Sequence, residues 1–156
     1  MADLLTHYVS ARLPGSFIAD PSARATLALG VFLPDLISKP MEAAPWMPFL
    51  AWAPSHSALG AFLVAWAIAM FFAEDFRFKA FATLFVGQLV HIAVDMGKDS
   101  MGFGSAFALL PFSTATVDAG LYTSQHVFFF LPVNLVVLWG LRWLSKKAQR
   151  EGWVWR

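Results

Sequence analysis

The chain has 156 residues, of which 58% are hydrophobic and 13% are charged. A soluble domain is typically about 45–50% apolar and about 25% charged, so a soluble chain of this length would leave too much apolar surface in water. The net charge of +1 excludes a general attraction to nucleic acid, and the lack of cysteine excludes disulfides, thiolate nucleophiles and cysteine-ligated metals. Composition therefore predicts an integral membrane protein whose surroundings are membrane lipid.

Two short helices are expected in the N-terminal part of the chain, which has no basic segment typical of a cleaved signal. The apolar spacing over residues 3–12 predicts the first helix. Asp20 followed by Pro21 predicts the start of the second, which would end before Pro34. Neither segment is long enough to cross a hydrocarbon core of ~30 Å.

Three longer apolar segments, residues 57–73, 79–96 and 124–144, predict membrane-spanning helices. Residues 97–120 contain four glycines and predict an irregular connection between the second and third spans. The expected fold class is therefore all-α: an integral membrane helical bundle with about three spanning helices plus two shorter N-terminal helices. All of it would form a single domain over residues 1–156.

Orientation follows from a basic cluster after the third span, because lysine and arginine favour the cytoplasmic side. The C-terminus is therefore expected in the cytoplasm. The start of the first span, the end of the second and the start of the third would then meet at the outer face. These three ends carry His56, His91, Asp95 and His126.

The segment HIAVD sets His91 and Asp95 four residues apart, on one face of a helix. Such a pair can ligate a metal, and an aspartate inside a membrane helix costs ~2.5–3.5 kcal/mol unless it finds a partner such as a divalent cation. Three further residues are candidates with an ordinary alternative each. Asp35 follows a proline and fits a turn, His7 fits the polar edge of an amphipathic helix, and His56 fits a helix cap with a neighbouring serine.

Taken as a set, these five residues offer nitrogen and oxygen ligands that suit Zn²⁺, with Mn²⁺ as the alternative. They could hold one closed tetrahedral site or an open site with two metals. In chain order the set is His7, Asp35, His56, His91 and Asp95.

The motifs around these residues occur in the order LLTHYVSARL, LGVFLPDL, PSHSALG, GQLVHIAVD and ALLPFS. This order resembles the bacterial and archaeal membrane-bound, metal-dependent hydrolase family that includes the inner-membrane YdjM-type proteins. The chain departs from the family pattern at Ala51, where many relatives have a histidine followed by arginine and glycine.

The resemblance implies a divalent metal held by the five residues and a location in the bacterial or archaeal inner membrane. It also implies a hydrolase in which metal-activated water cleaves an ester or phosphoester of a lipid or amphiphilic small molecule. His126 is the candidate proton donor to the leaving group. The alternative is a non-catalytic membrane protein in which the same residues hold a structural metal, or a hydrogen-bonded cluster, and the bundle serves partners.

Overall fold

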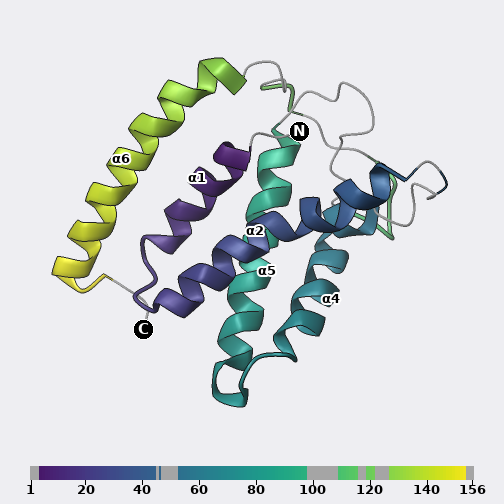
Figure 1. The fold of residues 1–156 in the computed structure, drawn as a ribbon, viewed down its shortest axis with the longest axis horizontal. Helices are drawn as coiled ribbons and strands as arrows, with labels where there is room; N and C mark the ends of the chain where they lie inside the picture. Colours follow the sequence, from purple (N-terminus) through teal and green to yellow (C-terminus); the bar gives the residue numbers. More distant parts are fainter. Residues whose placement is uncertain are drawn as a thin grey trace.

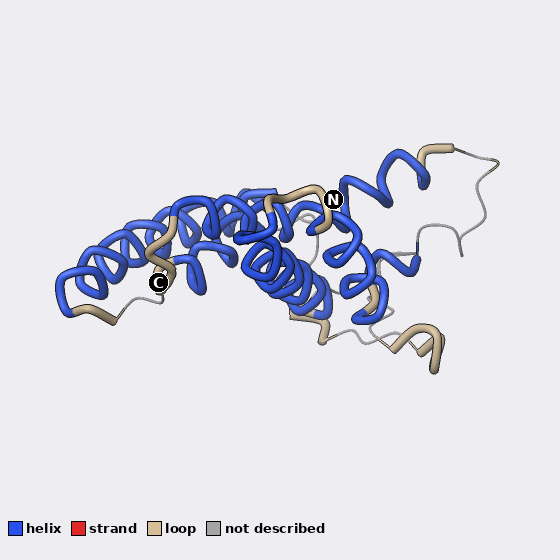
Figure 2. Tube along the Cα trace, turned by 90° about the horizontal axis from the view of Figure 1, so that it is seen from below, coloured by secondary structure: helices blue, strands red, loops and turns tan. Residues whose placement is uncertain are grey.

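The computed structural model describes residues 4–44, 46, 53–97, 109–115, 119–121 and 127–153. Helices are the regular elements of these described residues, and Figure 2 shows no strand among them, so the predicted all-α fold class is confirmed. Figure 1 shows α2 crossing α5 at the centre, with α4 on one side and α1 and α6 on the other. In chain order the elements are α1 (Leu4–Gly15), α2 (Pro21–Glu42), the short 3₁₀ helix η1 (Ala53–His56), α4 (Ala58–Ala69), α5 (Glu74–Met96) and α6 (Val127–Glu151).

Two of these helices begin with a side-chain cap at the N-terminus. Asp20 accepts hydrogen bonds from the backbone N–H groups of Ser22 at 2.9 Å and Ala23 at 3.4 Å, which satisfies donors that the first turn of α2 leaves free. Ser57 does the same for α4, where its hydroxyl accepts from the N–H of Gly60 at 3.0 Å. The predicted start of α2 is therefore confirmed, and the cap before α4 is supplied by Ser57.

The prediction that α2 ends before Pro34 is wrong, since the helix continues through that proline to Glu42. A proline inside a helix removes one backbone hydrogen bond and strains the preceding turn, which costs ~3 kcal/mol. Burial of apolar side chains offsets this cost, because Val31, Leu33 and Pro34 itself are all buried in the bundle. Asp35 therefore lies inside a helix, which corrects its interpretation as a turn residue.

Two glycines allow α2 and α5 to cross in close contact. A Cβ atom on Gly30 would overlap the backbone carbonyl of Leu84, and one on Gly87 would overlap the backbone carbonyl of Leu27. Small residues allow helix backbones to approach in this way. The two helices are also joined by a buried hydrogen bond of 2.6 Å between the hydroxyls of Thr26 and Thr83.

The other helices pack around this pair. Every fourth residue of α4 from Ala61 is a fully buried alanine, and the α4 backbone lies close enough to α5 for the Gln88 side chain to donate to the carbonyl of Ala61 at 3.1 Å. Helix α1 contacts α2, α5 and α6. Between α1 and α6, Asn134 donates to the hydroxyl of Thr6 at 3.1 Å, so this amide has a partner on a neighbouring helix.

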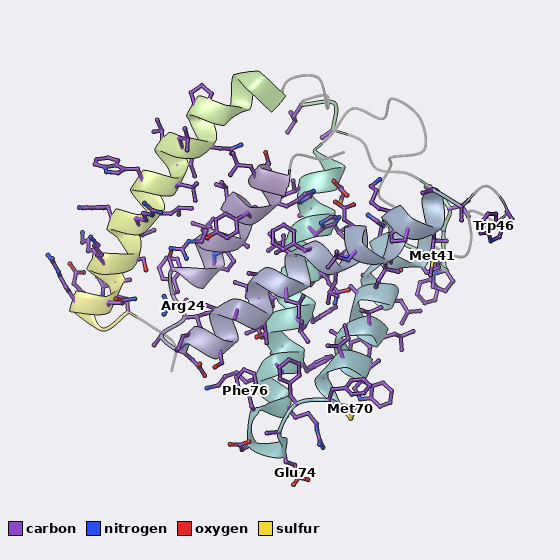
Figure 3. All side chains as sticks on the ribbon, in the orientation of Figure 1. Arg24, Met41, Trp46, Met70, Glu74 and Phe76 are labelled. Atoms are coloured by element: carbon purple, nitrogen blue, oxygen red, sulfur yellow. The ribbon has the colours of Figure 1, made fainter. Side chains whose placement is uncertain are left out.

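Helix α5 has the length and apolar composition needed to cross a membrane. No other helix of the described ranges has both. Three spans were predicted. Helix α4 has 12 residues and covers about 18 Å, which is short of a hydrocarbon core of ~30 Å. Large apolar side chains are exposed on α4 and α6, and Figure 3 shows side chains projecting outward from these two helices on opposite sides of the bundle. On α4 and α6 they include Phe62, Leu63, Trp66, Val136, Trp139 and Trp143.

The α2–α5 crossing predicts a position-specific penalty for one added methyl group. Gly87→Ala is expected to lower the free energy of unfolding by about 1–3 kcal/mol, because the new Cβ must push the two backbones apart. The matched control is Gly140→Ala on α6, where nothing lies within 4 Å of the added Cβ. Alanine is the better helix former by ~0.8–1 kcal/mol, so the control should keep or raise stability. Thermal unfolding in detergent measures both, and an unchanged melting temperature for Gly87→Ala would contradict the close crossing.

The ion pair between Asp20 and Lys79 predicts a pH dependence. The Lys79 ammonium donates to the Asp20 carboxylate at 3.1 Å, and this bond lowers the pKa of Asp20 below its ordinary value of 3.8. A carboxyl with a lowered pKa in the folded state stabilises that state above its ordinary pKa, and the effect disappears as pH falls through the lowered pKa. Asp20→Asn, which keeps a capping side chain, should therefore melt at a lower temperature than the parent at neutral pH. The difference should shrink towards zero as the pH falls below 3.8, and a difference that stays constant well below that pH would contradict the ion pair.

Candidate metal centre

The structure brings together all five candidate ligands, which come from four separate elements. His7 lies on α1, Asp35 on α2, His56 at the end of η1, and His91 and Asp95 on α5. Two overlapping groups have ligand atoms that all lie within 4.8 Å of one another: His7 with Asp35 and His91, and His56 with His91 and Asp95. His91 belongs to both groups and is therefore the centre of the cluster.

Asp95 contacts the three imidazoles of this cluster. One carboxylate oxygen lies 3.1 Å from Nε2 of His91 and 3.7 Å from Nε2 of His56, and the other lies 3.5 Å from Nε2 of His7. The Nε2 atoms of His56 and His91 are 3.4 Å apart, and Nε2 of His56 is 3.9 Å from a carboxylate oxygen of Asp35. Nitrogen and oxygen atoms thus converge from several sides on one small volume.

These separations fit a bound cation. Two ligand atoms bonded to one tetrahedral Zn²⁺ at ~2.0–2.1 Å lie ~3.3 Å apart, which is within the range found between the ring nitrogens and carboxylate oxygens. The donor set of three imidazoles and two carboxylates suits Zn²⁺ and Mn²⁺. The buried histidine and aspartate groups are therefore close enough to bind a metal ion.

Exposure of the five side chains is graded across the cluster. His7 and His91 are completely buried, whereas the side chains of His56 and Asp35 are 11% and 16% exposed. One edge of the cluster, formed by η1 and the middle of α2, is therefore accessible from outside. A metal held here would be reached by water or a ligand from the side of His56 and Asp35.

Neighbouring side chains orient the imidazoles. The hydroxyl of Ser55 lies 3.0 Å from Nδ1 of His56, which leaves Nε2 facing the cluster, as in metal sites where a second group fixes the ring. The rings of His7 and His91 stack with centroids 4.1 Å apart. Sequence reasoning considered Ser55 only as a helix cap and missed this contact, although the serine directly precedes the histidine.

The carboxyl group of Asp35 is held in its charged form. Burial alone would raise its pKa, but the His56 ring and the charge of His91 outweigh burial and lower it. An ionised carboxylate at the accessible edge is a suitable cation ligand without prior loss of a proton. His126, the candidate proton donor, lies outside the residues that the structure describes, and so does Ala51.

The geometry predicts that a divalent cation stabilises the fold through these residues. Zn²⁺ added to metal-free protein in detergent should raise the melting temperature, by the equivalent of ~2.7 kcal/mol when its free concentration is a hundred times its dissociation constant. His91→Ala should abolish the increase, because His91 takes part in both ligand groups. Ser38→Ala, a buried residue one turn after Asp35, should retain it. An equal increase in both variants would mean that the metal binds elsewhere.

Comparison of the chain with protein-family models, with curated proteins and with solved structures finds no match, so its function has to be argued from the site itself.

Proposed function

We propose that the chain is a metal-dependent hydrolase embedded in a membrane, related to the YdjM-type family that its motif order resembles. The proposed metal is Zn²⁺, with Mn²⁺ as the alternative. The proposed reaction is cleavage of an ester or phosphoester in a lipid or another amphiphilic molecule. The observation that carries the proposal is the convergence of five nitrogen and oxygen ligands on a site with one accessible edge.

The residues of the site divide into two roles in this proposal. His7, His91 and Asp95 form the buried side and hold the ion. His56 and Asp35 hold it from the accessible side, where the substrate arrives. When bound, the ion would lower the pKa of a water molecule from 15.7 to ~7, which makes it a nucleophile at neutral pH. The proton that this water loses would pass to solvent at the accessible edge formed by His56 and Asp35.

The proposed location is the inner membrane of a bacterium or archaeon, with three spans built on α4, α5 and α6. The apolar length of α5 and the exposed apolar faces of α4 and α6 support it. The basic residues near the end of α6 favour a cytoplasmic C-terminus. The site lies near the C-terminal end of α5, so it would face outward and receive a substrate from the outer leaflet.

A second candidate function is a structural metal site in a non-catalytic membrane protein that serves partners. The complete burial of His7 and His91 is the observation that favours it, because structural sites are closed by protein ligands. The accessible edge at His56 and Asp35 favours catalysis, since a catalytic ion needs an open position. The two functions differ in what removal of Asp35 does, because it is the most exposed member of the cluster.

The test combines metal analysis with hydrolysis assays on the purified protein in detergent. The parent is expected to contain a stoichiometric divalent metal and to hydrolyse members of a panel of lipid esters and phosphodiesters. Asp35→Ala should lower kcat/KM at least ~10²-fold by removing a ligand of the catalytic ion, while the metal-free variant should melt near the temperature of the metal-free parent. His91→Ala should lose both the metal and the activity.

Ser38→Ala is the control, since it removes a buried polar group on the same helix that is not part of the cluster. It should retain metal and activity. If the parent holds metal, hydrolyses nothing in the panel, and unfolds on loss of either Asp35 or His91, the structural function replaces the catalytic one.

A further inference from the structure

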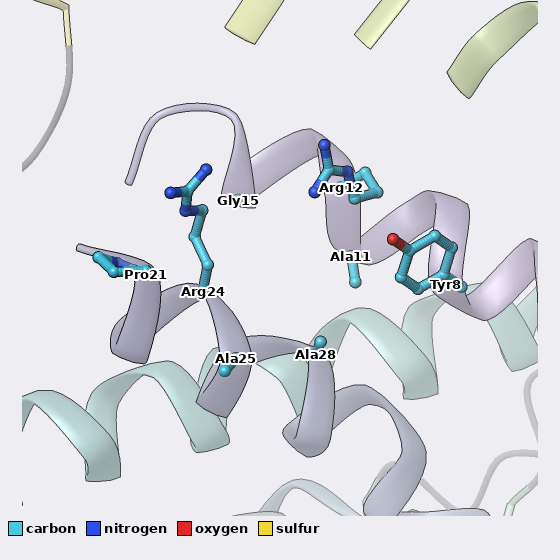
Figure 4. Close-up of a pocket in the computed structure, with 8 residues that line it drawn as sticks. All are labelled: Tyr8, Ala11, Arg12, Gly15, Pro21, Arg24, Ala25 and Ala28. Carbon is cyan, nitrogen blue, oxygen red and sulfur yellow. The ribbon is translucent and has the colours of Figure 1, made fainter. Parts of the chain in front are cut away.

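A cavity lies between the C-terminal half of α1 and the first turns of α2. Its volume is about 270 Å³, and Figure 4 shows the residues that line it. Tyr8 and Arg12 come from α1 and Arg24 from α2, above a floor of small residues that includes Ala11, Ala25 and Ala28. Along α2, Arg24 is eleven residues before Asp35, which corresponds to ~16 Å. The cavity is therefore separate from the proposed metal centre.

The cavity concentrates positive charge without a compensating carboxylate. Neither Arg12 nor Arg24 forms an ion pair with any residue in the described part of the chain. The nearby acid Asp20 is paired with Lys79 instead. Arg12 and Arg24 are both half-buried, and they line the same cavity from two different helices. The side chains of Arg12 and Arg24 and the hydroxyl of Tyr8 therefore offer hydrogen-bond donors to one cavity, and the described residues provide no acceptor for them.

This chemistry matches a phosphate group, because the planar guanidinium binds phosphate oxygens with paired, charge-assisted hydrogen bonds. The cavity has room for about nine water molecules at ~30 Å³ each, so it can take a headgroup larger than a phosphate ion. The same two helices expose the apolar side chains of Leu13 and Leu29, which acyl chains would cover. These features favour a phospholipid over free phosphate.

The position of the cavity agrees with an anionic lipid. Figure 1 shows the end of α1, the start of α2 and the end of α6 at the same edge of the bundle. The end of α6 carries a basic cluster, and such clusters attract the anionic lipids of the cytoplasmic leaflet. The members of the cluster are Arg142, Lys146, Lys147 and Arg150.

We propose that Arg12, Arg24 and Tyr8 bind the phosphate of an anionic phospholipid at the edge of the bundle opposite to the proposed outward-facing metal site. The proposal rests on the membrane location proposed above and is independent of hydrolysis. A bound lipid here would fix α1 against α2, and α1 carries His7. The lipid would therefore be a structural component of the bundle.

The test measures binding of short-chain phosphatidylglycerol, short-chain phosphatidylcholine and inorganic phosphate to the full-length protein in uncharged detergent. Phosphatidylglycerol is expected to bind about tenfold or more tighter than either of the others, since only it combines a net negative headgroup with acyl chains. Arg12→Gln combined with Arg24→Gln should remove this preference. Lys39→Gln combined with Arg77→Gln also removes two positive charges, at positions outside both the cavity and the basic cluster of α6, and it should leave the preference intact.

Equal affinity for phosphatidylglycerol and phosphatidylcholine would overturn the proposal, and so would equal affinity for inorganic phosphate, which would make the ligand a free ion. Retention of the preference in the double glutamine variant would also overturn it.

If that variant does not fold, Arg12→Lys combined with Arg24→Lys provides the test. Lysine keeps the charge and loses the paired donors, so phosphatidylglycerol should then bind several-fold more weakly than to the parent. Unchanged binding to the lysine variant would contradict the assigned contacts. Hydrolysis is not measured, so failure here is distinguishable from failure of the proposed enzyme.

Discussion

The backbone contact between α2 and α5 at Gly30 and Gly87 is the constraint on which the rest of the structure depends. Asp35 lies five residues after the first glycine and His91 lies four residues after the second, so each is about one helical turn from the crossing. Two helices whose backbones touch are still close one turn further on. A carboxylate and an imidazole on different helices therefore reach the same cluster. A wider crossing would separate the two ligand groups that His91 joins.

The charged groups of this site can be buried only because neighbouring groups compensate their charge. Two carboxylates lie beside three imidazoles in a part of the bundle where His7 and His91 have no contact with solvent. Buried charges cost several kcal/mol each unless partners compensate them. The histidines compensate in part through contacts of 3.1–3.7 Å with Asp95. A divalent cation would complete the compensation, which is why the same residues suit both a structural and a catalytic interpretation.

Much of this arrangement was predictable from the sequence, and the parts that were not share a physical reason. Local chemistry predicted the cap at Asp20, and the chain order of polar residues in apolar surroundings predicted that His7, Asp35, His56, His91 and Asp95 would meet. The continuation of α2 past Pro34 was missed because burial against the bundle, which a local pattern does not contain, offsets the proline. The glycine crossing was missed because it needs two positions 57 residues apart to be considered together. Length and composition support one span in the described residues, because α4 is shorter as a folded helix than its apolar sequence suggested.

The position of the cluster residues in the chain determines when they come together during synthesis. Every one of the five ligands precedes α6 in the chain, and α6 makes its helix contacts mainly with α1. While the polypeptide leaves the ribosome, the five residues are not all present until Asp95 has emerged, and none of the described residues that follow Asp95 belongs to the cluster. A cation bound as proposed could therefore be taken up before α6 is synthesised, and α6 would then pack against a bundle that already contains it.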